Sequence, residues 1–134
     1  SKPNITERQG LVTSRVGQGY YRGQILTRWE KKCATTGLSI TTVLIASHIH
    51  PWKDATDEER LDVGNGILLS PNLDALFDKH LISFEDNGKI LISKLLSENQ
   101  KDVLGLDGLS LREVYEDMMS YLALHREVFY ETQR

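Results

Sequence analysis

The chain has 134 residues, of which 40% are hydrophobic and 26% are charged. This is ordinary for one globular domain that is long enough to bury a core. No apolar run approaches the roughly 20 residues of a membrane-spanning helix. The single cysteine, Cys33, excludes an internal disulfide framework and a zinc site built from cysteine pairs, and it indicates a reducing compartment. We therefore predict a cytoplasmic protein with no membrane segment and no structural zinc.

The net charge of −3 is divided unevenly along the chain. Residues 1–32 contain seven lysines and arginines but only two glutamates, so they carry a net charge of +5 and the remainder carries −8. A basic segment of this kind suits a ligand with a phosphate backbone, because lysine and arginine contacts supply non-specific affinity for it. A solvated helix face would have the same composition, and charge alone does not separate the two.

The N-terminal residues 1–16 are polar and show no sustained hydrophobic period, so we expect a leader or linker followed by a single domain over residues 17–134. From Gln18 to Lys32 the pattern is helical, with one apolar face formed by Tyr21, Ile25, Leu26 and Trp29. The turn that follows contains Cys33, which we expect to be a small buried side chain, and ends at Gly37.

The next segment predicts a strand that carries a histidine at its end. Thr41–Ala46 is β-branched and apolar, as strands are, and His48 lies at its end, two residues after Ala46. Pro51 and Trp52 break the strand, and we expect both tryptophans of the chain to lie in the core. Lys53–Asp62 is charged and is expected to be a mobile loop.

A second strand and a helix are predicted after this loop. Asn65-Gly66 favours a turn into the apolar strand Ile67–Leu69. The helix is expected from Ser70 to Lys79, with Ser70 as its N-cap and Pro71 at its first position.

Two carboxylates lie on this predicted helix. Asp74 and Asp78 are one turn apart, beside the apolar face, so both can reach one ion. Carboxylate oxygens are hard ligands that suit Mg²⁺ or Mn²⁺. Together with His48, whose side chain titrates near neutral pH, they have the layout of a metal site with a base. The alternative is that the aspartates only stabilise the helix dipole.

The C-terminal half predicts a hairpin and a helix. An Asn-Gly pair favours a β-hairpin between Leu81–Phe84 and Lys89–Ser93. Ser110 and Glu113 have the spacing of a capping box, and apolar residues continue from there at helical spacing to about residue 130. These elements predict an α+β fold.

Taken together, these motifs resemble those of the HNH endonucleases, which have a ββα-metal (His-Me finger) fold. The resemblance rests on SHI-x-PW at residues 47–52, on NGILLSPNLDALFDKHLISF at residues 65–84, and on the run from Gly17 to Gly37. It is strongest for the branch with the SHI-x-PW motif that is found in restriction-endonuclease-like proteins. It implies a finger core at about residues 41–80, flanked by an N-terminal helix, a β-hairpin and a long C-terminal helix.

The resemblance also implies roles for individual residues in metal-dependent hydrolysis of DNA phosphodiester bonds. His48 matches the histidine that activates water, and Asn65 matches the asparagine that ties the loop across the finger by hydrogen bonds. Asp74 and Asp78 match helix positions of the family's metal ligands, with Mg²⁺ as the expected ion and Mn²⁺ as the alternative. Ser47 departs from the pattern, since some relatives have a metal-binding aspartate or histidine there.

Other side chains are candidate contacts to nucleic acid: Arg22, Arg28, Lys79, His50 and His80. The arginines and the lysine are more readily explained as ordinary surface charges, and His80 could instead be a third metal ligand. DNA is the expected partner, and the protein is expected to be the cleavage module of a restriction or defence system. A homodimer, and a targeting domain or subunit outside this chain, stay open. Two further functions also stay open, a non-catalytic binding or interaction module that keeps the scaffold and a nuclease that acts on RNA.

Overall fold

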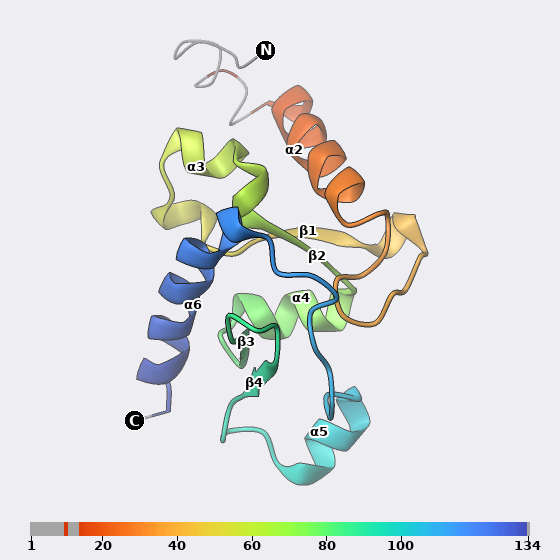
Figure 1. The fold of residues 1–134 in the computed structure, drawn as a ribbon, viewed down its shortest axis with the longest axis vertical. Coiled ribbons are helices and arrows are strands. Elements are labelled where there is room, and N and C mark those ends of the chain that lie inside the picture. Colours follow the sequence, from red (N-terminus) through yellow and green to blue (C-terminus); the bar gives the residue numbers. More distant parts are fainter. Residues whose placement is uncertain (1–9, 11–13, 134) are drawn as a thin grey trace.

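The computed structural model describes residue 10 and residues 14–133, and it shows helices arranged around two small antiparallel sheets (Figure 1). The fold is therefore α+β, as predicted. The strands form the pairs β1 (Ile45–His48) with β2 (Gly66–Leu69), and β3 (Ile82–Phe84) with β4 (Ile90–Ile92). The α-helices are α2 (Arg15–Arg28), α3 (Asp57–Leu61), α4 (Pro71–Asp78), α5 (Glu98–Leu104) and α6 (Met119–Glu131). No helix within residues 14–133 is both long and apolar enough to cross a membrane.

Helix α2 is displaced towards the N-terminus relative to the prediction. It begins at Arg15, because the Ser14 hydroxyl caps it by accepting a hydrogen bond from the Gly17 amide at 2.9 Å. The helix thus takes in the end of the predicted leader; residues 1–9 and 11–13 of that leader lie outside the described residues. The helix ends before the predicted point because Glu30 and Lys31 adopt φ of 58° and 57°, which helical backbone does not allow.

The buried face of α2 packs on the first sheet. Tyr21, Ile25 and Trp29 on this face are at most 5% exposed. A Cβ atom at Gly66 of β2 would lie only 2.2 Å from Ile25 Cδ1 and 2.5 Å from the Tyr21 hydroxyl, so the helix approaches the strand as closely as glycine permits. The buried Trp29 confirms its predicted place in the core, and Cys33 is fully buried as predicted.

Strand β1 begins later than predicted. Residues Thr41–Val43 form a 3-10 turn, and the strand runs from Ile45 to His48. The Arg22 guanidinium explains the late start, since it donates to the carbonyl oxygens of Thr41 at 2.8 Å and Leu44 at 2.6 Å, which a strand would use for pairing. His48 still stands at the end of the strand, as predicted, where it pairs with Gly66.

The segment between β1 and β2 contains regular structure, so the prediction of a mobile loop there was wrong. It contains the 3-10 turn η2 (Trp52–Asp54), helix α3 and the 3-10 turn η3 (Val63–Asn65). Thr56 and Glu59 form a capping box at the start of α3, a spacing that was readable in the sequence. Trp52 was expected in the core but is 45% exposed, and the Arg60 guanidinium of α3 lies 3.8 Å from the centre of its ring.

Helix α4 follows β2 as predicted and packs on β1 and β3 through Leu73 and Phe77. The chain therefore contains the strand–strand–helix order of the predicted finger. Helices α2 and α4 lie on opposite sides of the β1–β2 pair (Figure 1). Each face of this small sheet is thus covered by a different helix.

In the C-terminal part, the predicted hairpin is confirmed, but the predicted start of the last helix was wrong. Strands β3 and β4 pair around the Asn-Gly turn as predicted. The predicted capping box at Ser110 does not exist, because Ser110 bridges to Lys89 and the Leu111 amide donates to the Gly88 carbonyl at 2.8 Å. Backbone that pairs with the hairpin cannot start a helix, and α6 begins only at Met119, after the turn η4 (Glu116–Met118).

Candidate active site

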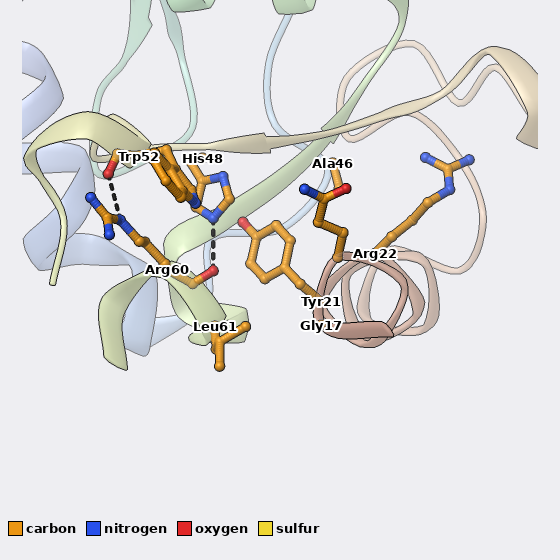
Figure 2. Close-up of a pocket in the computed structure, with 9 residues that line it drawn as sticks. Gly17, Tyr21, Arg22, Ala46, His48, Trp52, Arg60 and Leu61 are labelled. Atoms are coloured by element: carbon orange, nitrogen blue, oxygen red, sulfur yellow. Dashed lines mark hydrogen bonds between the residues drawn. The ribbon is translucent and has the colours of Figure 1, made fainter. Parts of the chain in front are cut away.

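His48 is held by two contacts at the end of β1 (Figure 2). Its ring stacks on Tyr21 of α2 with 4.2 Å between centroids and an angle of 3° between the planes. Its Nε2 lies 2.8 Å from the carbonyl oxygen of Arg60 in α3. Because a carbonyl oxygen only accepts hydrogen bonds, Nε2 carries the proton and Nδ1 is left as the basic nitrogen.

The surroundings of His48 favour its neutral form. Burial lowers the pKa of His48 below its ordinary value, and the positive charge of Arg60 acts in the same direction. The hydrogen bond to the Arg60 carbonyl opposes this shift but does not reverse it. The imidazole is therefore neutral at neutral pH and can accept a proton at Nδ1, which makes no hydrogen bond with the described residues.

Tyr21 also links the helix to the loop behind His48. Its hydroxyl donates a hydrogen bond of 2.6 Å to the Asn65 carbonyl. Burial, as the largest cause, raises the pKa of this hydroxyl far above its ordinary value, so it stays protonated and remains a donor. The ring that stacks on His48 is thereby fixed at both ends, by α2 and by η3.

An open pocket of about 550 Å³ lies in front of His48 and Tyr21 (Figure 2). Its wall is formed by Gly17, Gln18, Tyr21, Arg22, Ala46, His48, Trp52, Arg60 and Leu61. The lining residues include two arginines and no carboxylate, although Arg22 is bonded to main-chain carbonyls and Arg60 is paired with Asp57 just outside the wall. The lining itself is therefore positive in character and suits an anionic ligand. Its cations come from α2 and α3, and its histidine comes from β1.

Asn65 ties the segment between the strands together. Its side chain is fully buried, and its Oδ1 accepts from the His50 amide at 2.7 Å. Its Nδ2 donates to the carbonyl oxygens of Glu59 at 3.1 Å and His50 at 3.3 Å. These bonds cross from η3 to both ends of the segment, which is the hydrogen bonding that the resemblance implied for this residue.

The aspartates of α4 lie on the other face of β1. The Asp74 carboxylate accepts a short hydrogen bond from the hydroxyl of Ser47, which is 6% exposed. Asp78 is one turn further and exposed, and no bond joins it to Asp74. Ser47 and His48 are neighbours in a strand, so their side chains point to opposite faces. The structure thus brings together Ser47 and Asp74 on one face, and His48, Tyr21 and Arg60 on the other.

The oxygen donors on the α4 face fit a hard cation better than zinc. Asp74 and Ser47 offer adjacent carboxylate and hydroxyl oxygens, and Mg²⁺ binds few protein ligands because it keeps several waters. Over residues 14–133 no group of three or more histidines, cysteines, aspartates or glutamates is arranged to hold a metal. A cation here would accordingly use few protein ligands.

Two predicted phosphate contacts are engaged inside the protein. Arg28 forms two hydrogen bonds with Asp117, at 2.6 and 2.9 Å, and lies over the Tyr115 ring. Arg22 braces the start of β1 through main-chain oxygens, although it also lines the pocket. Lys79 is exposed and forms no ion pair with any described residue.

The two remaining histidine candidates lie in different surroundings. His50 is half-buried, with its main chain bound by Asn65. His80 has φ of 55° and stacks on His125, and its Nε2 is buried without a hydrogen bond to any residue in the described part of the chain. Burial, as the largest cause, lowers the pKa of His80, while Asp78 opposes this. His80 is therefore part of the packing below α4, away from the pocket wall.

The sequence did not reveal three members of the pocket. Tyr21 was predicted only as part of an apolar helix face, and Trp52 only as a core residue. Arg60 binds His48 through its main-chain carbonyl oxygen, and a carbonyl is present in every residue, so the sequence gives no sign of this contact. The capping-box spacing at Thr56 was the one signal that could have placed α3, and with it Arg60, behind the histidine.

Comparison with known protein families gives a match to part of the chain. No curated protein matches the chain. Residues 33–85 match the model of a family described as HNH endonuclease. This segment contains β1, β2 and α4, with His48, Asn65 and Asp74, whereas Tyr21 and α6 lie outside it. The part of the chain that carries both faces of the candidate site is thus similar to HNH endonucleases, in agreement with the motifs of the sequence.

Proposed function

We propose that the chain is the cleavage domain of a metal-dependent endonuclease that hydrolyses DNA, related to the SHI-x-PW branch and acting in a restriction or defence system. The observation that carries this proposal is the arrangement of His48. Its Nε2 is bound by the Arg60 carbonyl, its ring is stacked on Tyr21, and its basic Nδ1 is left for a ligand. The match of residues 33–85 to an HNH endonuclease family supports the reaction class.

In the proposed reaction, His48 acts as general base. Its Nδ1 takes a proton from the water that attacks the phosphorus atom, a contribution that is typically worth about 10²–10⁴ in rate. The positive charge that forms on the ring is delocalised towards Nε2, where the Arg60 carbonyl accepts the hydrogen bond. Asn65 keeps this carbonyl in place, because it binds the neighbouring Glu59 carbonyl.

Asp74, with the Ser47 hydroxyl, is the proposed holder of the divalent cation, and Asp78 is the second carboxylate within reach on α4. When bound, such a cation supplies Lewis-acid stabilisation of the charge on the departing oxygen. Asp74 contributes the negative charge, and Ser47 fixes the direction of its carboxylate. The two faces of β1 would thus supply the two parts of the reaction, one the base and the other the cation.

A nicking assay on supercoiled plasmid tests the proposal, with Mg²⁺, Mn²⁺ or EDTA and with wild type against His48→Ala and His48→Asn. We expect metal-dependent nicking that falls by about 10²–10⁴ in both variants, because neither side chain can take up a proton near neutral pH. Circular dichroism of each variant controls for folding. A folded His48→Ala variant that nicks at the wild-type rate would contradict the proposal.

A second candidate function is a binding module that keeps the scaffold without catalysis. One observation favours it, namely that the candidate base and the candidate cation ligands face opposite sides of β1. Such a module would bind DNA equally well in EDTA and would not nick it under any metal. The same assay therefore separates the two functions, and a parallel digestion of RNA separates the two polymers.

A further inference from the structure

Trp52 and Arg60 form a fixed pair at the edge of the His48 pocket (Figure 2). The Arg60 guanidinium lies 3.8 Å from the centre of the Trp52 ring, and its Nε donates to the Trp52 carbonyl at 2.7 Å. Asp57 holds the same guanidinium at 3.3 Å. An exposed tryptophan normally loses side-chain freedom when it binds a ligand, but this one is already held in place.

The pocket combines apolar aromatic surface with positive charge. Tyr21, Trp52 and Leu61 contribute the apolar part, and Arg60 contributes positive charge beside Trp52. Its volume of about 550 Å³ is in the range of small-molecule sites and exceeds what a phosphate alone would fill. Aromatic faces bind nucleobases by stacking, and cations bind the phosphates that link them. A nucleotide offers both in one ligand.

The position of His48 in the same wall decides which nucleotide this would be. If His48 activates the attacking water, the phosphate that is attacked must lie at the pocket. The nucleotide attached to that phosphate is then the one that can reach Trp52, which lies in the same wall. In a duplex both faces of each base are covered by neighbouring bases. A base can reach a protein pocket only when it is unpaired or has left the stack.

We propose that the pocket in front of His48 binds the base of an unpaired nucleotide in DNA, with Trp52 as the stacking surface and Arg60 as the cation that fixes it. Arg60 covers one face of the Trp52 ring, so the base stacks on the other face, and the adjoining phosphate lies towards His48. The inference rests on the proposed function in one respect, namely that this phosphate is the one that is cleaved. The binding of an unpaired base stands on the pocket itself.

Binding is measured in EDTA, so that DNA is not cleaved, by the anisotropy of labelled oligonucleotides of about 12 nucleotides, single-stranded or paired. Wild type is expected to bind the single strand more tightly than the duplex. Trp52→Leu is expected to weaken single-strand binding about tenfold and leave duplex binding unchanged, because it removes the aromatic face but keeps apolar bulk. Trp52→Phe should keep most of the affinity.

Tyr130→Ala is the matched control, since Tyr130 is an exposed aromatic residue on α6 outside the pocket. It should change neither affinity. Tryptophan fluorescence locates the ligand independently, because Trp29 is buried and Trp52 is exposed. Single-stranded DNA should quench the wild-type signal, and this quenching should disappear in Trp52→Phe.

Equal wild-type affinity for single strand and duplex, or a folded Trp52→Leu variant that keeps the preference for single strands, would overturn the inference. Its failure is distinguishable from failure of the proposed function. If nicking depends on His48 but Trp52 has no effect on binding, the proposed base-binding role of the pocket is wrong and the proposed nuclease function stands. If binding depends on Trp52 but no metal supports nicking, the proposed nuclease function is wrong and the base-binding role of the pocket stands.

Discussion

The two faces of strand β1 are built in different ways. On the α2 face, His48 is fixed by a stacked ring, a carbonyl acceptor and a buried hydroxyl, and these come from α2, α3 and η3. On the α4 face, the Asp74 side chain forms a hydrogen bond with Ser47 and with no other residue within 14–133. The proposed base, His48, thus packs on Tyr21, which lies outside the segment that matches the HNH family, whereas the proposed cation ligands lie within it. A motif segment alone would carry the histidine without its full support.

Removal of the Asp74 carboxylate should have the largest effect on the α4 face. We expect Asp74→Ala to lower the cleavage rate about 10³-fold, because a bound cation supplies several kcal/mol of charge stabilisation. Asp78→Ala, which removes the exposed carboxylate one turn away, is the matched control and should have a smaller effect. Rates measured over a Mg²⁺ titration check this. Equal losses in both variants would contradict the dominant role of Asp74.

Removal of the stacked ring should have the next largest effect, and it should act only on the α2 face. Tyr21→Leu is expected to lower the cleavage rate about 10–100-fold, since a base that is displaced by about 1 Å loses up to about 10² in rate. Tyr21→Phe keeps the ring and loses only the bond to Asn65, so its loss should be smaller. The apparent Mg²⁺ affinity should stay the same in both variants, because the ring does not contact Asp74.

The pH dependence of the Tyr21 variants separates positioning from simple loss of stability. Less burial in Tyr21→Leu should move the pKa of His48 up towards its ordinary value, so the acid limb of the rate profile should shift to higher pH. A rate that falls without any shift of this limb would indicate that Tyr21 has no particular relation to His48.

The packing below α4 should make the protein sensitive to acid. His125 is 2% exposed, and its nitrogens contact Ser83 Oγ and the Phe77 carbonyl at 2.8 Å each. Burial, followed by the charge of His80, lowers the pKa of His125 to about 3. Between pH 6.5 and about 3 the unfolded chain therefore binds a proton that the folded chain does not. As the pH falls through this window, this group should cost about 1.4 kcal/mol of stability per pH unit.

Urea unfolding at a series of pH values checks this effect, with His125→Leu as the comparison. The variant lacks the titrating group, so its stability should fall less steeply below pH 6.5, even though its stability at pH 7 is reduced by the lost hydrogen bonds. Parallel curves for the two proteins would show that another group causes the acid sensitivity.

Much of the fold near the motif was predictable from the sequence, because local signals and tertiary structure agree there. The strand Ile67–Leu69, the helix after Pro71 and the Asn-Gly hairpin all combine a hydrophobic period with a turn or cap residue. At Ser110 they disagree. The capping-box spacing is present, but Ser110 pairs with Lys89, and this pairing requires an extended backbone. The tertiary contact therefore prevents a helix from starting there.

The candidate site was predictable only in part for a different reason. Residue type and spacing select His48, Asn65 and Asp74 as candidates, because the proposed chemistry depends on their side chains. The support of His48 comes from a main-chain carbonyl at Arg60, which every residue type possesses, and from Tyr21, whose pattern is that of any buried helix face. The prediction placed Trp52 in the core because hydrophobicity alone does not distinguish a core ring from one that lies at the edge of a pocket against an arginine.

The most direct test of the account is nitrogen NMR of the His48 imidazole over a pH titration, assigned by comparison with His48→Asn. The account predicts that Nε2 carries the proton, that Nδ1 is the free basic nitrogen, and that the ring titrates below pH 6.5, since burial lowers its pKa. A proton on Nδ1, or a pKa above 6.5, would contradict the assignment of His48 as a pre-oriented neutral base.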